Sequence, residues 1–162
     1  MAVKRFALTA ALATLIAAGP AAAVDLATAK KMADACEAKA TQEGWKMNIA
    51  VVDDGADLVL FRRMDGAFLG SVQIAQLKAE TSAKFPMPSR ALGEIAFGKD
   101  GQPGRAPGLA FVPGLAAFPG GLPVKTADGA HLGAIGVSGG TGDQDEACAQ
   151  AALDAVAGQL KP

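Results

Sequence analysis

The spacing of apolar residues predicts a helix near each end of the chain. In residues 25–44, apolar positions recur every three or four residues, as on one buried helix face: Leu26, Ala29, Ala33, Cys36 and Ala40. Asp25 precedes this stripe as a helix N-cap, and Gly44 ends it. A last helix opens at Asp143 or Asp145. Its predicted core face carries Ala149, Ala152, Leu153, Val156 and Leu160.

Between these helices the pattern changes to alternation. Residues 45–52 place Trp45, Met47, Ile49 and Val51 on one side, which predicts a strand. A turn over residues 53–57 joins it to a second strand over residues 58–64, so the two form a hairpin. We then expect a helix that begins with Ser71 as its cap and ends near residue 85, because Pro86 and Pro88 disfavour helical geometry.

Residues 98–121 hold seven glycines and four prolines, which exclude a regular helix. The apolar content of this segment argues against a freely solvated coil, so we expect a loop ordered by contacts with another subunit. Short strands follow over residues 122–124, at a sheet edge because of Pro123, and over residues 131–137. The fold class is therefore α/β (α+β), with a mostly antiparallel central sheet flanked by N- and C-terminal helices.

The N-terminus has the layout of a secretory signal. Lys4 and Arg5 precede an apolar run over residues 6–18, and Ala21-Ala22-Ala23 offers the small residues that signal peptidase recognises. The run is too short for a stable membrane anchor. We predict cleavage after Ala23 and a periplasmic or secreted protein, with a buried N-terminal helix as the alternative.

Composition limits the function classes. Residues 24–162 have the length of one domain, and without Lys4 and Arg5 they carry 13 basic and 16 acidic residues. No basic stripe or aromatic platform is present, so nucleic-acid binding is not expected. No later segment has the length of a membrane span, so we expect no stable membrane insertion after cleavage.

The two cysteines, Cys36 and Cys148, lie near opposite ends of the predicted domain. In an oxidising compartment such an even pair is a candidate for a disulfide between the first and last helices. Two buried free thiols are the alternative. Neither cysteine has a partner at metal-ligand spacing, so a zinc site is not expected.

Several segments together resemble the GlcG/HbpS family, in the family's order and over nearly the whole predicted domain. They are residues 49–53 (Ile-Ala-Val-Val-Asp), Arg63-Met64-Asp65-Gly66, Lys78-Ala79, residues 120–124 (Gly-Gly-Leu-Pro-Val), and residues 133–139 followed by Asp145. The resemblance implies an α/β domain with a central antiparallel sheet that commonly forms homo-oligomers. It also implies links to haem binding, glycolate-utilisation clusters and corrinoid metabolism.

The resemblance favours a ligand site that includes Arg63, Asp65 and Lys78. Arg63 and Lys78 suit carboxylates such as haem propionates, Arg in a bidentate manner and Lys as a point charge. Asp65 would hold Arg63 in position. A structural ion pair and a solvated lysine are the alternative interpretation. The remaining candidate ligand-binding residues are Gly120, Gly121 and Ser138.

His131 is the single histidine and therefore the candidate haem-iron ligand. On a regular strand it shares a face with Gly133, Ile135 and Val137, and a structural histidine is the commoner outcome. Met64 and Met87 are weaker candidates, because methionine mostly fills cores. The glycines at 133–142 do not match a nucleotide-binding loop, and neither Ser138 nor Cys148 has a recognisable base. No catalytic residue is assigned.

Two functions remain open. One is an exported protein that binds haem or another tetrapyrrole for sequestration or sensing. The other is an accessory enzyme or binding protein for a small organic acid, such as a 2-hydroxy acid in a glycolate-type pathway. A small-molecule ligand is common to both.

Overall fold

The computed structural model describes residues 23–160, so the predicted signal segment lies outside the described residues, except for Ala23. The elements in chain order are α1 (Leu26–Glu43), β1 (Asn48–Asp53), β2 (Leu58–Arg63), α2 (Ser71–Lys84), α3 (Ser89–Phe97), β3 (Gly98–Lys99), β4 (Gln102–Pro103), the 3-10 helix η1 (Pro107–Phe111), β5 (Gly121–Lys125), β6 (His131–Ser138) and α4 (Gly142–Val156). Within residues 23–160, no helix has the length and apolar character needed to cross a membrane.

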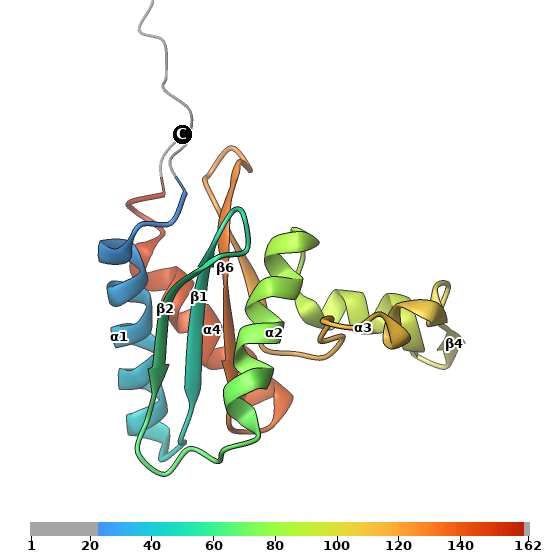
Figure 1. Ribbon diagram of the computed structural model, residues 1–162, viewed down its shortest axis with the longest axis horizontal. Helices are drawn as coiled ribbons and strands as arrows, with labels where there is room; N and C mark the ends of the chain where they lie inside the picture. The colour runs from blue at the N-terminus through green and yellow to red at the C-terminus, as the bar shows by residue number, and fades with distance from the viewer. Residues whose placement is uncertain (1–22, 161–162) are drawn as a thin grey trace, which may run out of the picture.

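Four strands form one sheet in the order β2-β1-β6-β5, and every neighbouring pair is antiparallel. Helices α1 and α4 pack on one face of the sheet, and α2 packs on the other (Figure 1). This arrangement confirms the predicted fold class, the first hairpin and the edge position of Pro123.

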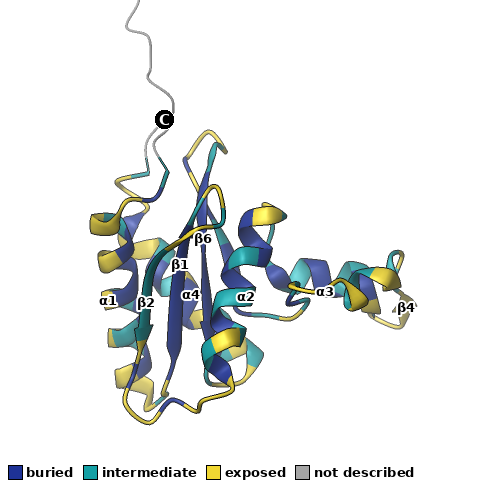
Figure 2. Ribbon diagram, in the orientation of Figure 1, coloured by how far each residue is buried: buried dark blue, intermediate teal, exposed yellow. Residues whose placement is uncertain are grey.

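The central strands are buried on both faces, as the dark strands β1 and β6 in Figure 2 show. Met47, Ile49 and Val51 belong to the core beneath α1 and α4, whereas Ala50 and Val52 face α2. Small residues on the α2 side let that helix approach the sheet closely. A Cβ atom at Gly136 would collide with the backbone of α2 at Ala75 and Ala79.

The helix ends agree only in part with the sequence pattern. Asp25 caps α1 by accepting a 2.7 Å hydrogen bond from the Thr28 N–H, but Leu26 is half exposed and lies off the buried stripe. Helix α4 is capped by Thr141 in a capping box with Gln144, not by an aspartate. Helix α2 has no side-chain cap, because its N-cap residue is Gly70; Ser71 is instead the first helical residue, and its hydroxyl donates to the Phe68 carbonyl at 2.8 Å.

Residues 86–118 form an arm that extends sideways from the sheet (Figure 1). Helix α3 was not predicted, and it follows directly on the proline-containing turn that ends α2. The glycine-rich segment then adds the β3–β4 hairpin and η1, and the Ala106 N–H donates to the Ile95 carbonyl at 3.0 Å. Contacts within the chain therefore order much of this segment.

A disulfide joins Cys36 of α1 to Cys148 of α4, with a Cα–Cα distance of 4.7 Å. Both residues are fully buried where the two helices pack together. The structure confirms the predicted pairing and rules out the alternative of two free thiols.

Candidate functional site

The structure brings four candidate residues to one end of the sheet. Asn48 at the start of β1 pairs with Arg63 on one side and with Ser138 on the other. The carbonyl of Gly120, just before β5, accepts a 2.8 Å hydrogen bond from the Val137 N–H. Arg63, Ser138 and the Gly120–Gly121 pair therefore share this end of the sheet, although they are far apart in the sequence.

Lys78 of α2 is buried at the same end, with its side chain 1% exposed. Its Nζ atom donates to Oδ2 of Asp145 at 2.7 Å and to the Val137 carbonyl at 2.9 Å. The ring of Phe118 covers the same amine at 4.9 Å from its centroid. Two of the three N–H donors of the ammonium group are therefore used, and burial under the Phe118 ring closes the group to an external carboxylate in this conformation.

Burial sets the electrostatics of this ion pair. It lowers the pKa of Lys78 and raises the pKa of Asp145, because a low-dielectric surrounding penalises each charged form. The hydrogen bond between the two groups opposes both shifts, and the Gly140 N–H adds support by donating to Oδ1 of Asp145 at 2.9 Å. The pair ties α2 to the end of β6 and to the start of α4.

Gly120 and Gly121 are required here by packing. A Cβ atom at Gly120 would lie 2.7 Å from Nζ of Lys78, and the residue has a φ of +119°. A Cβ atom at Gly121 would lie 2.7 Å from Oγ of Ser82 and collide with the Lys78 backbone. These glycines therefore allow α2 to close over the edge of the sheet.

Arg63 ends β2 with an exposed side chain, and its Nη2 donates to the Ala67 carbonyl at 3.0 Å. This backbone carbonyl, and not Asp65 as expected, orients the guanidinium; Asp65 is exposed and forms no ion pair among residues 23–160. The next residues, Phe68 and Leu69, are 55% and 76% exposed. Arg63 forms no ion pair among residues 23–160, and its guanidinium is held at the backbone of Ala67, directly before these two exposed apolar residues.

His131 lies at the opposite end of the sheet, at the start of β6. Ser138 is seven positions further along the same strand, or about 23 Å. The face predicted for His131 is wrong. Leu132 has no partner in β5 and forms a bulge, so Leu132, and not His131, shares a face with Ile135 and Val137. Burial and the nearby Lys125 lower the pKa of His131, and neither ring nitrogen has a hydrogen-bond partner within residues 23–160.

Other chemistry is limited in the described part of the chain. The sulfur of Met64 is buried and lies 3.4 Å from the Met47 N–H, so it serves the core. Cys148 is in the disulfide and cannot act as a nucleophile. Residues 23–160 contain no cluster of three His, Cys, Asp or Glu side chains that could hold a metal ion.

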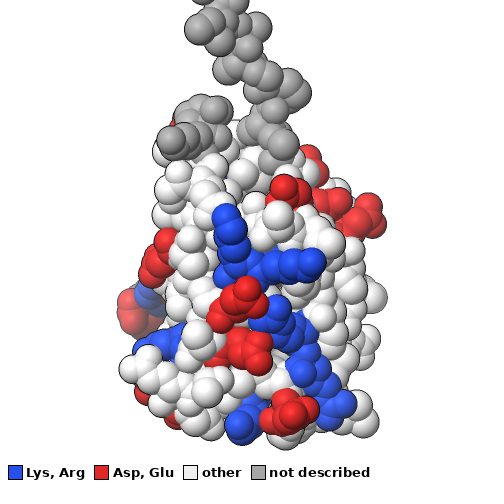
Figure 3. All heavy atoms as spheres, turned by 90° about the vertical axis from the view of Figure 1, so that its left-hand side faces the viewer, with Lys and Arg blue, Asp and Glu red and all other residues white. Residues whose placement is uncertain are grey.

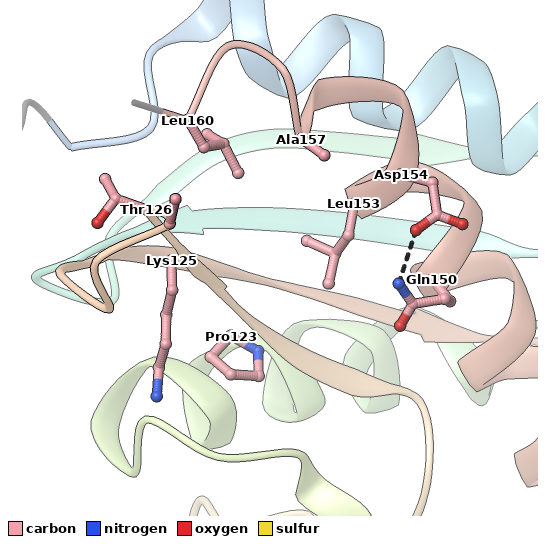
Figure 4. A pocket seen from close by; sticks show the side chains of 9 residues that line it. Pro123, Lys125, Thr126, Gln150, Leu153, Asp154, Ala157 and Leu160 are labelled. Atoms are coloured by element: carbon pink, nitrogen blue, oxygen red, sulfur yellow. Dashed lines mark hydrogen bonds between the residues drawn. The ribbon is translucent and has the colours of Figure 1, made fainter. Parts of the chain in front are cut away.

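A pocket of about 330 Å³ lies between the edge strand β5 and the C-terminal half of α4 (Figure 4). Leu153 and Leu160 supply apolar walls, and Gln150 donates to Asp154 at 2.8 Å on one side. None of the residues predicted as ligand contacts lines this pocket.

Charge on the α1 and β2 side of the molecule is mixed, with acidic side chains lying between basic ones (Figure 3). Arg62 illustrates the pattern, since its Nη1 contacts Asp34 at 2.6 Å and Glu37 at 2.7 Å. A face of this kind does not present the concentrated positive surface typical of nucleic-acid binding.

The sequence interpretation missed the partner of Lys78. Asp145 was placed at the helix start, yet it lies on the buried stripe with Cys148, Ala149 and Ala152. A carboxylate in a stripe of apolar residues indicates a buried ion pair, because an unpaired buried charge is very unfavourable. That spacing was the available signal.

The comparisons with known proteins define the family. The model of a family described as haem-degrading protein HbpS-like matches residues 24–154. The chain belongs to this family, and the predicted resemblance to GlcG/HbpS proteins is confirmed. An uncharacterised 15.0 kDa protein of Citrobacter freundii, from the dhaT-dhaS intergenic region, is 40% identical over 136 residues, which are 82% of this chain and 92% of that protein.

Protein GlcG of Escherichia coli K12 is 37% identical over 102 residues, which are 62% of this chain and 69% of GlcG. Among solved structures, Klebsiella pneumoniae ORFY has a TM-score of 0.76 at 34% identity, covering 88% of this chain and 97% of ORFY. A double mutant of Streptomyces reticuli HbpS has a TM-score of 0.73 at 32% identity, covering 93% and 97%. A PduOC–haem complex has a TM-score of 0.72 at 25% identity, covering 82% and 94%.

Proposed function

We propose that this protein binds haem or a related tetrapyrrole at the exposed loop that follows β2, and that it does so through the carboxylates of the ligand. The proposal rests on Arg63, whose guanidinium is held at the Ala67 carbonyl, directly before the exposed residues Phe68 and Leu69. A guanidinium suits a propionate, and exposed apolar side chains suit a porphyrin face. A family described as haem-degrading and a relative solved with haem support this ligand class.

The donor set at this loop fits the carboxylates of haem better than its iron. Met64 is occupied in the core, and His131 lies at the other end of the sheet. Arg63 would therefore hold a propionate, with Phe68 and Leu69 shielding the ring from water. Bound haem would supply redox and oxygen chemistry; the residues of this loop would bind and orient it. The end of the sheet next to this loop would be supported by the other predicted residues, Lys78, Gly120, Gly121 and Ser138.

A haemin titration followed by the Soret band tests this proposal. Arg63→Met keeps much of the aliphatic stem and removes the charge, so affinity should fall by roughly ten- to a hundredfold. Phe68→Ser should also weaken binding. Lys30→Met, which removes an exposed cation from α1, is the control and should bind haemin like the wild type.

His131→Ala should affect haemin affinity less than Arg63→Met does. The reverse order would show that iron ligation dominates and would contradict the proposal. A wild-type protein that binds neither haemin nor a small carboxylate such as glycolate would remove both the haem function and the organic-acid function.

We also propose that the chain is exported and cleaved after Ala23. Two observations support this proposal: the family match begins at Val24, and the Val24 N–H donates to the Leu132 carbonyl at 2.9 Å. Intact mass of the protein recovered from the periplasm or medium tests this. A chain that retains residues 1–23 there would contradict it.

A further inference from the structure

The arm carries a groove of about 540 Å³ between α3 and the β3–β4 hairpin, away from the end of the sheet described above. Ala91, Ile95 and Pro103 give it an apolar wall. Glu94, Lys99 and Arg105 stand around that wall. An apolar surface with a few polar groups is the usual composition of a small-molecule site.

The shape of this groove is fixed by two close backbone contacts. A Cβ atom at Gly98 would collide with the Gln102 carbonyl, and one at Gly104 would collide with the Ala96 carbonyl. The Ala106 N–H also donates to the Ile95 carbonyl at 3.0 Å. The hairpin is therefore held against α3 by the chain itself, and the groove is preformed.

Two acidic and two basic residues line the groove, and only one ion pair forms between them. Lys99 pairs with Glu94 at 2.9 Å, and this hydrogen bond raises the pKa of Lys99. Asp100 lies close enough to Lys99 to reinforce the shift, so one lysine faces two acids. Arg105 is exposed and has no ion-pair partner among residues 23–160. Its guanidinium is therefore available to an anion.

We propose that this groove binds a medium-chain aliphatic monocarboxylate. The carboxylate pairs with Arg105, and the hydrocarbon chain lies over Ala91, Ile95 and Pro103. An uncharged chain of the same length lacks the guanidinium contact and binds more weakly. The site is separate from the haem-binding loop proposed at Arg63, so the two proposals stand or fall independently.

Calorimetric titration of the mature protein with octanoate tests the groove, with 1-octanol as the uncharged probe. Octanoate should bind the wild type more tightly than octanol does. Arg105→Gln should weaken octanoate binding by about tenfold and leave octanol binding unchanged. Ala91→Trp should abolish both by filling the groove. Lys30→Gln, which removes an exposed cation from α1, is the matched control and should change neither.

Three results would overturn the inference. They are no octanoate binding up to roughly 10 mM, equal binding by wild type and Arg105→Gln, and equal affinity for octanol and octanoate. Circular dichroism establishes that each variant is folded. Haemin titration of Arg105→Gln should match the wild type whatever becomes of the haem proposal, and a selective loss of haemin binding would show that the groove is a haem site instead.

Discussion

Lys78 and Asp145, which are 67 residues apart in sequence, form an ion pair of 2.7 Å in which both side chains are buried. The lysine joins α2 to the sheet, and the aspartate belongs to the first turn of α4. The pair therefore fixes helices on opposite faces of the sheet relative to each other. Its main role in this conformation is positional.

We predict that Lys78→Met destabilises the protein by about 3–5 kcal/mol, because it leaves the Asp145 carboxylate buried without its partner. The double variant Lys78→Met/Asp145→Leu should lose less than the sum of the single variants. Urea unfolding measures each free energy. Lys30→Met, on the exposed side of α1, is the control, and a Lys78→Met protein as stable as that control would contradict the prediction.

The disulfide gives a second prediction. Mature protein that is denatured without reduction should contain no titratable thiol, because Cys36 and Cys148 are joined. Reduction should lower the free energy of unfolding by about 4–5 kcal/mol in the chain-entropy model, since the bridge closes a loop of 112 residues. Two titratable thiols per chain before reduction would contradict the pairing.

Elements with regular periodicity were predictable from the sequence. The alternation of Met47, Ile49 and Val51 gave β1 and its buried face, and the 53–57 turn gave the hairpin. Helix α3 was not predicted, because it is short and starts immediately after Pro88, where the prolines indicated only the end of the preceding helix. The bulge at Leu132 was not predicted, because strict alternation assumes that every residue has a partner in the neighbouring strand.

The candidate site was predictable as residue types but not as contacts. Arg63, Ser138 and Gly120 do meet at one end of the sheet, which follows once the strand order is known. Spacing within α4 indicates that Asp145 is buried, but the identity of its partner depends on how α2 and α4 pack against β6. The Ala67 carbonyl that orients Arg63 is a backbone group, so residue identity carries no signal for it.

His131 should make stability depend on pH. Its pKa in the folded protein is lowered below the usual 6.5, mainly by burial, so the unfolded chain binds a proton more readily. The free energy of unfolding is therefore highest above about pH 6.5, and it decreases as the pH falls toward the lower pKa of the folded protein. Urea midpoints between about pH 7.5 and 5.5, where most carboxylates stay ionised, should fall for the wild type but much less for His131→Gln.

The arm leaves three phenylalanine side chains exposed, of which Phe118 is the least exposed at 45%. Phe111 is 84% exposed and Phe97 is 67% exposed. We predict that another subunit covers them, so light scattering should give a multiple of the monomer mass. Phe111→Ser should lower that mass, whereas Leu58→Ser on the sheet should not. A monomeric wild type, or rapid proteolysis within residues 98–121 of the assembled protein, would contradict this.

Gly121 should tolerate no side chain, because α2 packs directly against its backbone. A methyl group there would meet Oγ of Ser82 at 2.7 Å and collide with the Lys78 carbonyl; the serine hydroxyl can rotate away, but the carbonyl cannot move without shifting the helix. Gly121→Ala should therefore lower the free energy of unfolding by about 1–3 kcal/mol. Gly108→Ala is the matched control, since nothing lies within 4 Å of its Cβ position, and its effect should stay within about 0.5 kcal/mol. Equal urea midpoints for the two variants would show that the glycine is not needed for packing.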